Sequence, residues 1–259
     1  MSLASRIRTR LARYRYAPHI QVTPATGLMR LGSSYGGWTF DASRDLERST
    51  IISCGLGEDA SFDVEFAARF HARVILVDPT PRAIQHFAAL KARLGEPKLV
   101  PYAKGGKQPA EAYDLTQLDE NNLTLVPVAI WVENGPLRFY APRNPEHVSH
   151  SIVNLQNNYS ADDPHIEVPG ITPEDLVKKL DLGTVSLVKL DIEGAEISVI
   201  PHMLQHSIRP AQLLVEFDEM LFPSQRSRLN AESTDALLQR AGYTCRHFDG
   251  LSNFLYTAE

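Results

Sequence analysis

The residues best suited to chemistry lie in a glycine turn. An apolar run from Thr50 to Cys54 leads into Gly55 and Gly57, and the residues from Ala60 to Phe70 have a helical pattern. Glycines at this spacing let the backbone pass close beneath a ligand, which a Cβ would block. The next apolar run ends in Asp78, and an acid there in a parallel βαβ unit accepts hydrogen bonds from ribose hydroxyls. The pattern predicts a nucleoside-binding half-site.

Glu58 and Asp59 indicate which nucleoside this turn binds. The run Gly55 to Ala60 fits a dinucleotide pattern, in which a pyrophosphate rests on the N-terminus of the helix. Two carboxylates repel a pyrophosphate, by roughly 3 kcal/mol for each charge pair at about 5 Å and an effective dielectric of about 20. S-adenosylmethionine has no phosphate and carries a sulfonium and an ammonium, so the same acids favour it. The alternative is that both acids only complement the helix dipole.

Two later strand-like runs also end in acids. Residues 185–190 precede Asp191 and Glu193, and the following run ends in Glu216 and Asp218. Because ligands of parallel sheets bind at the carboxyl ends of the strands, these acids are expected to meet in one electronegative crevice. Asp191 and Glu193 are the first candidates for a base that removes a proton from an acceptor hydroxyl. For Glu193, the alternative is again a helix-dipole interaction.

A polar segment at 147–152 supplies one further candidate. It contains His147 and His150 with two serines, and His150 is the second choice for the base; an ordinary polar surface loop is the alternative. A metal held by Asp191 and Glu216 is not predicted, because no histidine joins them at ligand spacing.

Apolar runs alternate with helical patterns along the chain. This alternation predicts an α/β fold with a doubly wound, mostly parallel sheet. A Glu-Asn-Gly turn at 133–135 predicts a hairpin, and the polar stretch 97–121 is interpreted as an insertion or mobile loop near the site. Strands are expected at 51–54, 73–77, 123–131, 137–140, 185–190, 212–218, 243–248 and 253–257. Helices are expected at 60–70, 81–94 and 233–241, with one further helix that begins at 173 and another that ends at about 204.

Residues 1–49 are set apart from a domain at 50–259. Residues 1–40 contain six arginines and no acid, so with a net charge of −5 for the chain the remainder carries −11. The acidic body argues against a broad nucleic-acid surface. Residues 1–16 have the pattern of a basic amphipathic helix, which docks on an anionic membrane, resembles a transit peptide, or packs along the domain. A glycine-rich loop with Tyr35 and Trp38 either closes over a cofactor or packs on the domain.

The composition bounds the remaining choices. The chain has 259 residues, of which 43% are hydrophobic and 22% charged, as in ordinary soluble proteins. Its apolar runs fall short of the ~18 residues that span a bilayer. Cys54 and Cys245 fall in predicted strands, which favours a reducing compartment and a cytoplasmic protein over a disulfide framework.

Four stretches resemble the FkbM-type S-adenosylmethionine-dependent methyltransferases. The resemblance covers roughly residues 53–218, and its most specific part is the last stretch. It implies a Rossmann-like, seven-stranded class I methyltransferase fold in which the closing hairpin inserts an antiparallel last strand. The stretches are Gly55-Leu56-Gly57-Glu58-Asp59 with Ser61-Phe62-Asp63, Val77-Asp78-Pro79-Thr80-Pro81, Val148-Ser149-His150-Ser151, and Lys189-Leu190-Asp191-Ile192-Glu193-Gly194-Ala195-Glu196.

By position, the resemblance implies roles for individual residues. Gly55 and Gly57 would line the methionine part of the donor. Asp78, followed by Pro79, would hold the ribose. Ala129 and Ile130 would flank the adenine, and Glu58, Asp59 and Asp191 complete the predicted cofactor contacts.

Together these inferences predict an S-adenosylmethionine-dependent methyltransferase acting on a hydroxyl oxygen of a sugar, polyketide or other small metabolite. One alternative is an NAD-dependent oxidoreductase, which needs a substrate domain and a loop tolerant of pyrophosphate, and the sequence indicates neither. The other is a non-catalytic binding module that keeps the fold without a working pocket.

Overall fold

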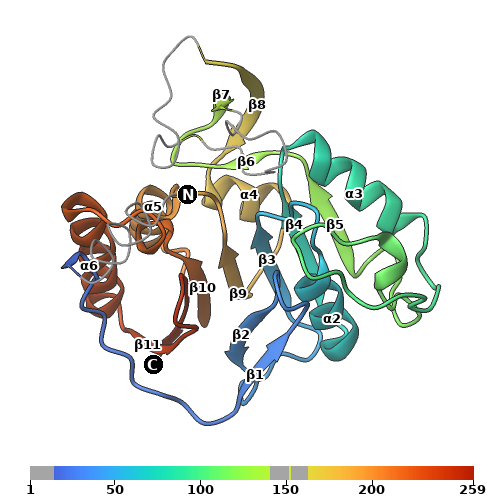
Figure 1. Ribbon diagram of the computed structural model, residues 1–259, viewed down its shortest axis with the longest axis horizontal. Coiled ribbons are helices and arrows are strands. Elements are labelled where there is room, and N and C mark those ends of the chain that lie inside the picture. Colours follow the sequence, from blue (N-terminus) through green and yellow to red (C-terminus); the bar gives the residue numbers. More distant parts are fainter. Residues whose placement is uncertain (1–14, 141–151, 153–162) are drawn as a thin grey trace, which may run out of the picture.

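A seven-stranded sheet forms the centre of the molecule (Figure 1). The computed structural model describes residues 15–140, 152 and 163–259. The strand order is β11-β12-β10-β9-β3-β4-β5. β12 is antiparallel to both of its neighbours, and the other neighbouring pairs are parallel, which confirms the mostly parallel sheet with an inserted antiparallel strand. The strands are β3 (Thr50–Cys54), β4 (Arg73–Val77), β5 (Leu123–Val126), β9 (Val185–Leu190), β10 (Gln212–Glu216), β11 (Tyr243–Phe248) and β12 (Asn253–Ala258).

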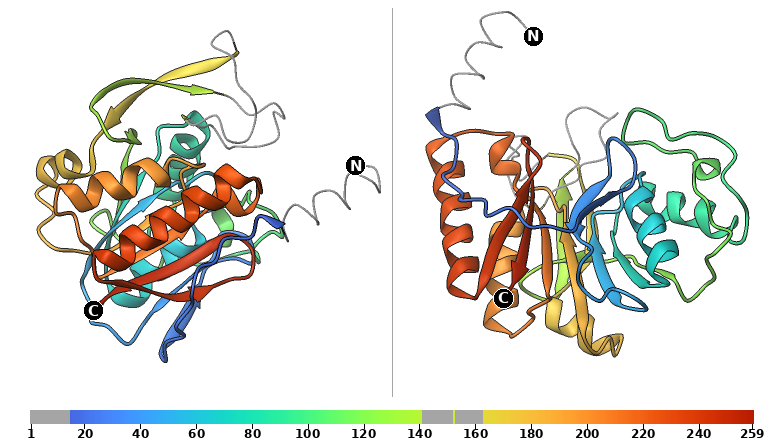
Figure 2. Two further views of the ribbon diagram at one scale, coloured as in Figure 1. Left: turned by 90° about the vertical axis from the view of Figure 1, so that its left-hand side faces the viewer. Right: turned by 90° about the horizontal axis from the view of Figure 1, so that it is seen from below.

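Helices cover both faces of this sheet (Figure 2). One face packs against α2 (Ser61–Phe70) and α3 (Pro81–Lys91), and the other against α4 (Pro173–Lys179), α5 (Glu196–Gln205) and α6 (Gln225–Arg240). The result is the three-layer arrangement expected of strands that alternate with helices.

Strand β4 shows how the sequence produces this arrangement. Val74 and Leu76 belong to the core on the α2 and α3 side, whereas Ile75 and Val77 belong to the core on the other side. Successive side chains of a strand point to opposite faces, so a strand that is covered on both faces has a continuous apolar sequence. All four side chains are buried.

A second sheet of three strands packs beside the first and corrects two predictions. It consists of β6 (Ala129–Ile130), β7 (Gly135–Tyr140) and β8 (His165–Ile171), in the order β6-β8-β7. The predicted hairpin is wrong, because β8 lies between β6 and β7 and pairs with both. The single strand predicted at 123–131 is also wrong. It divides at Pro127, which has no N–H to donate, and its two parts join different sheets.

The chain before β3 forms a hairpin that belongs to the core. The hairpin consists of β1 (Leu28–Leu31) and β2 (Trp38–Asp41), which pair antiparallel. The ring of Phe40 packs edge-on against the rings of Phe66 and Phe70 on α2. The backbone of Asp41 exchanges hydrogen bonds of 2.8 and 3.0 Å with the Gln212 side chain. The hairpin is thereby fixed to α2 and to β10.

Several boundaries differ from those predicted. Helix α6 begins at Gln225, eight residues before the predicted start, and Ser224 caps it by accepting a hydrogen bond from the Ser227 amide. The stretch 97–121 is a packed insertion: it contains the short 3₁₀ helix η1 (Ala110–Ala112) and buries Tyr113 and Leu115. Residues 1–14, with the predicted basic helix, lie outside the described residues. None of the helices in the described part of the chain is long and apolar enough to cross a bilayer.

Candidate functional site

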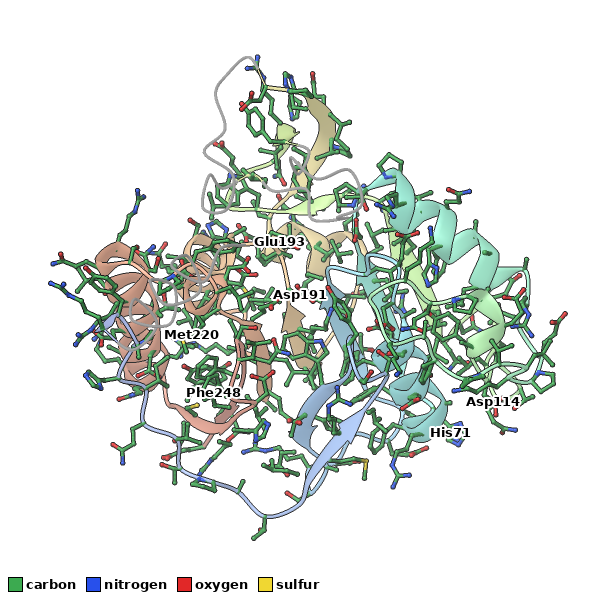
Figure 3. The ribbon with its side chains drawn as sticks, in the orientation of Figure 1. His71, Asp114, Asp191, Glu193, Met220 and Phe248 are labelled. Atoms are coloured by element: carbon green, nitrogen blue, oxygen red, sulfur yellow. The ribbon has the colours of Figure 1, made fainter. Side chains whose placement is uncertain are left out.

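A cavity of about 590 Å³ lies at the carboxyl ends of β3, β4, β9 and β10. Its volume is typical of small-molecule sites. Asp191 and Glu193 follow the end of β9 at the middle of the molecule (Figure 3). His150 lies outside the described residues. The remaining predicted site residues all line the cavity: Gly55, Gly57, Glu58, Asp59, Asp78, Pro79, Ala129, Ile130, Asp191 and Glu193.

The glycine turn is required by packing within the chain. Gly55 has a φ of +85°, and a Cβ at this position would lie 1.9 Å from the backbone oxygen of Asp191. Gly57 has a φ of +53°. The amide of Gly55 donates to the Val77 carbonyl at 3.0 Å. The turn therefore fits between β4 and β9, and Gly55 is needed there whatever the ligand.

The carboxylate of Asp78 organises this turn. Its Oδ2 accepts hydrogen bonds from the amides of Leu56 and Gly57 at 3.0 and 2.9 Å. Its Oδ1 accepts from the amide and hydroxyl of Thr80 at 2.8 and 2.7 Å. These four bonds occupy the acceptor positions of a carboxylate. Asp78 thus joins β4 to the loop that follows β3.

Asp59 acts at the N-terminus of α2. Its Oδ1 accepts from the Ser61 amide at 2.9 Å, and the Tyr113 hydroxyl accepts from the Ala60 amide at 3.0 Å. Ser33 and Gln108 donate to the Oδ2 of Asp59 at 2.7 and 3.1 Å. The helix-dipole interpretation therefore describes Asp59. Two amides at this end of the helix, that of Ser61 in α2 and that of Ala60 just before it, thus already have acceptors from the protein, and a pyrophosphate needs such amides.

Glu58 is paired with two cations. Its carboxylate lies 2.6 Å from the guanidinium of Arg82 and 3.3 Å from the ammonium of Lys107, and its side chain is 12% exposed. The repulsion argued from the sequence treated Glu58 as an unpaired charge. The two cations offset that charge, so Glu58 contributes less to the potential of the cavity than the sequence argument supposed.

Lys189 is a site residue that the sequence analysis did not select. Its Nζ donates to the backbone oxygen of Gly55 at 2.7 Å and lies 3.6 Å from Oδ2 of Asp191. Burial lowers the pKa of Lys189, but the carboxyl groups of Asp191 and Asp63 raise it by more, so the net shift is upward. Lys189 is therefore a buried ammonium at the floor of the cavity. The sequence did contain a signal for this residue, because a lysine within an otherwise apolar central strand is unusual.

Glu216 was predicted to lie in the acidic crevice but was given no role, and the structure places it at the cavity. Burial raises its pKa well above the usual value, and the neighbouring charge of Asp191 and a hydrogen bond with that residue raise it further. Ser252 donates to its Oε1 at 2.8 Å. Glu216 and Asp191 thus form a close carboxyl pair, and the upward shift of the Glu216 pKa favours the protonated form of that residue.

The cavity as a whole is acidic. Among the described residues, eight carboxyl groups line it, against the cationic side chains of Arg30 and Lys189. Water-poor walls strengthen the field of such a cluster, so the cavity favours a cationic ligand. The eight are Glu58, Asp59, Asp78, Asp191, Glu193, Glu216, Asp218 and Asp249.

Comparison with known proteins gives one result for this chain. The family model of the methyltransferase FkbM domain matches residues 41–245, from the end of β2 into β11. A comparison with curated proteins finds no match. The matched range contains β3, β4, β5, β9 and β10 in full and the first part of β11, and it ends before β12.

Proposed function

The chain belongs to the FkbM methyltransferase family, and from this premise we propose that it transfers a methyl group from S-adenosylmethionine to a hydroxyl oxygen of a small metabolite or sugar. The observation that carries the choice of donor is the excess of carboxyl groups around the cavity. S-adenosylmethionine combines a sulfonium, an ammonium and a carboxylate with an uncharged nucleoside, so its net charge is positive. A cavity with this charge attracts the two cations.

The residues present fit this donor. Ala129 and Ile130 are buried and give the cavity an apolar wall, which suits an adenine ring. The turn at Gly55 and Gly57 brings backbone to the opposite side, and Asp78 holds the amides of that turn in place. When bound, the donor supplies a methyl carbon that is activated by positively charged sulfur.

A dinucleotide fits less well. The amides of Ala60 and Ser61, at the start of α2, already donate to Tyr113 and Asp59, so a pyrophosphate that used these two amides would have to displace both acceptors. It would also meet the acids that line the cavity. These two features together favour the methyl donor over NAD.

We assign the removal of the acceptor's proton to Asp191. Its carboxyl group is 30% exposed and stands between the ammonium of Lys189 and the carboxyl group of Glu216. The proton of the acceptor hydroxyl would pass to Asp191 as its oxygen bonds to the methyl carbon; the carbon–sulfur bond would break with its electron pair remaining on sulfur, and S-adenosylhomocysteine would leave. The other contribution of the chain is alignment of the oxygen with that carbon. Glu193, which lines the same cavity, and His150 are the next candidates for the base.

Calorimetry and a turnover assay test this function. The full chain should bind S-adenosylmethionine and leave NAD unbound at the same concentration. Incubation with methyl-labelled donor and a panel of hydroxyl compounds should then transfer label to oxygen. Tighter binding of NAD would overturn the choice of donor, and donor binding without transfer to any hydroxyl, amine or thiol would leave a binding module.

Asp191→Asn tests the assignment of the base. The substitution removes the acceptor of the proton but keeps the size of the side chain, so kcat should fall by about 10²- to 10⁴-fold. The affinity for S-adenosylmethionine should change much less. Asp114→Asn, far from Asp191 (Figure 3), is the control. An unchanged kcat in Asp191→Asn would move the assignment to Glu193 or His150.

A further inference from the structure

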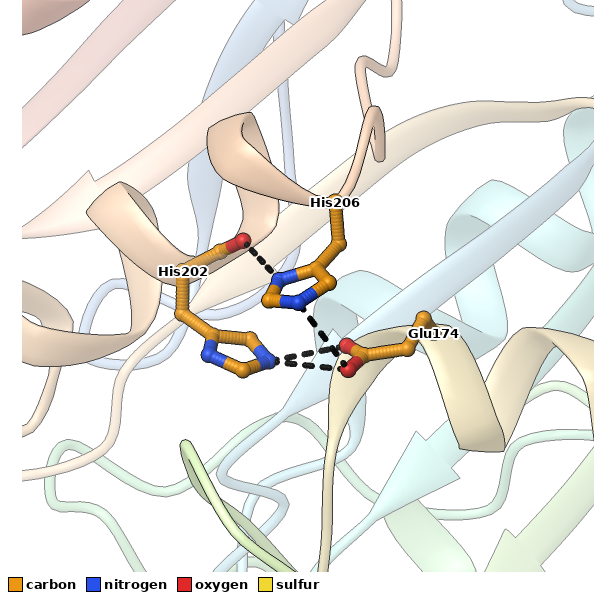
Figure 4. Close-up of side chains that lie close together, drawn as sticks. All are labelled: Glu174, His202 and His206. Atoms are coloured by element: carbon orange, nitrogen blue, oxygen red, sulfur yellow. Dashed lines mark hydrogen bonds and ion pairs between the residues drawn. The ribbon is translucent and has the colours of Figure 1, made fainter.

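Three metal-binding side chains meet outside the cavity, between α4 and α5. His202 lies in the last turn of α5, His206 caps the C-terminal end of that helix four residues further on, and Glu174 lies in the first turn of α4 (Figure 4). The Nε2 of His202 lies 2.9 and 3.1 Å from the two carboxylate oxygens of Glu174. The Nε2 of His206 lies 3.8 Å from the nearer of them. One donor atom from each residue falls within 4.8 Å of the others.

The backbone sets the orientation of the second imidazole. The Nδ1 of His206 lies 2.9 Å from the carbonyl oxygen of His202. A carbonyl only accepts, so this contact places the proton on Nδ1 and leaves Nε2 with a lone pair. That lone pair faces the carboxylate of Glu174. Such a backbone contact to the distal ring nitrogen is the usual support of a metal-binding histidine.

Burial of the cluster is graded. The side chain of His202 is 14% exposed, that of Glu174 30% and that of His206 45%. One side of the cluster is therefore held in the protein while the other meets solvent. An ion has an entry path, and a water molecule has room for the remaining coordination position.

The donor set selects the kind of ion. Two imidazole nitrogens and one carboxylate oxygen suit Zn²⁺, which takes three such ligands and one water in tetrahedral geometry. Zn–N bonds of about 2.0–2.1 Å place tetrahedral ligands roughly 3.4 Å apart. This spacing lies between the 2.9 Å that separates Nε2 of His202 from the Glu174 carboxylate and the 3.8 Å that separates Nε2 of His206 from it. Ca²⁺ and Mg²⁺ require more oxygen ligands than the cluster provides.

We propose that Glu174, His202 and His206 bind one Zn²⁺ ion that links α4 to α5. Helix α4 follows β8 directly, and β8 pairs with β6, whose two residues line the cavity. The ion would therefore fix the small sheet to the helical layer behind the cavity. The ion would lie outside the cavity and stand apart from methyl transfer.

Calorimetric titration with ZnCl₂ tests the site directly. The full chain, without a polyhistidine tag and after treatment with a chelator, should bind one Zn²⁺ per chain at pH 7.5. Binding should weaken steeply below about pH 6.5, because protons compete for both imidazoles. Co²⁺ in place of Zn²⁺ should give the intense visible absorption of a four-coordinate site.

Three variants and a control locate the ion. Glu174→Gln, His202→Gln and His206→Gln should each weaken Zn²⁺ binding by about 10- to 100-fold or more. Each should also lose most of the increase in Tm that Zn²⁺ gives the wild-type chain. His71→Asn removes an exposed imidazole on the far side of the molecule (Figure 3) and should leave binding unchanged. Circular dichroism checks that all variants fold.

Two results would overturn the proposal. The first is the absence of one-to-one Zn²⁺ binding at pH 7.5; the cluster would then be an ion pair that strengthens when its histidines are protonated. The second is Zn²⁺ binding that persists unchanged in His202→Gln and His206→Gln, which would place the ion elsewhere.

Discussion

At the level of single residues, the carboxyl groups around the cavity divide into two kinds. Asp78 and Asp59 accept hydrogen bonds from backbone amides and fix the loops that carry them. Asp191 and Glu216 face one another, and Lys189 lies beside Asp191. The first kind builds the cavity, whereas the second is available to a substrate.

Asp78→Asn is expected to weaken binding of S-adenosylmethionine by roughly tenfold or more. The glycine turn would lose a charge-assisted hydrogen bond to the carboxylate that holds it in place. An amide offers one acceptor oxygen, so its NH₂ group would confront the amides of Leu56 and Gly57 or those of Thr80. Calorimetry measures the affinity. Asp114→Asn is a matched control, because Asp114 also accepts from the amide and hydroxyl of a threonine two residues on, at an exposed position. If Asp78→Asn and Asp114→Asn bound the donor with equal affinity, the hydrogen bonds of Asp78 to the turn would not contribute to donor binding.

Glu196 is a buried acid with a structural role. Its Oε1 accepts from the Ile192 amide at 2.6 Å, which closes the loop between β9 and α5. Burial raises the pKa of Glu196 well above its usual value, and repulsion from Asp218 adds to the effect. The folded protein therefore holds a proton on Glu196 that the unfolded chain releases above pH ~4.5. This proton stabilises the fold at low pH, and its contribution is lost as the pH rises toward the folded pKa.

Glu196→Gln should therefore gain stability over the wild type as the pH rises from 5 to 8. A glutamine keeps the acceptor for the Ile192 amide and has no proton to lose. The difference in unfolding free energy between the variant and the wild type should therefore widen by up to about 1.4 kcal/mol per pH unit. Urea unfolding at several pH values measures it. Glu120→Gln, at an exposed site, should show a constant difference. If this difference in unfolding free energy narrowed as the pH rises, the upward shift of the Glu196 pKa would be contradicted.

At the level of elements, the approach of β3 to β9 determines the floor of the cavity. Gly55 and Gly95 have nearly equal φ angles of +85° and +84°. A Cβ on Gly55 would meet the Asp191 carbonyl at 1.9 Å, whereas nothing lies within 4 Å of a Cβ on Gly95. The two positions share the backbone requirement and differ in crowding.

Gly95→Ala should cost about 1–2 kcal/mol of unfolding free energy, the penalty of a Cβ in the left-handed region. Gly55→Ala should lose a further 1–3 kcal/mol or more through the collision of its Cβ with backbone. Donor binding should fall only in Gly55→Ala. Urea unfolding and calorimetry give the two quantities. If Gly55→Ala and Gly95→Ala lost equal amounts of unfolding free energy, β9 would have to shift to accommodate the added methyl group.

The sequence predicted the elements that have strong local patterns. β4 and β9 were predicted to the residue, because both are apolar on both faces. The first half of α6 was missed because it is largely polar. The pairing of β8 between β6 and β7 has no local signal, since residues 165–171 are well separated in sequence from both partners.

The site was predictable to the same degree. Most cavity residues within the motifs were named from the sequence, although Lys189 was not, and residues brought in from afar were missed. Tyr113 lies 53 residues from the amide that it accepts from, and Glu174 lies 28 residues from His202. The interpretation of 97–121 as a loop near the site was right about its place, because Gly106 lines the cavity and Gln108 contacts Asp59.

At the level of the whole molecule, the charge of the cavity should control affinity through salt. Raising NaCl from 0.1 to 1 M shortens the screening length from about 10 to about 3 Å, so S-adenosylmethionine should bind at least about threefold more weakly. Adenosine shares its nucleoside and has no charge, so its affinity should hold. Calorimetry at both salt concentrations compares them. A parallel loss for both ligands would mean that the acids do not act on the donor's cations.

The position of β12 has a consequence for how this protein is made. β12 is synthesised after β11, yet it lies between β11 and β10. Until residues 253–258 leave the ribosome, β10 keeps an open edge of unpaired amides and carbonyls, and such edges attract strands from other chains. The nascent protein is thus most prone to aggregation just before that strand emerges, and a stalled ribosome at this point would release a species that chaperones must shield.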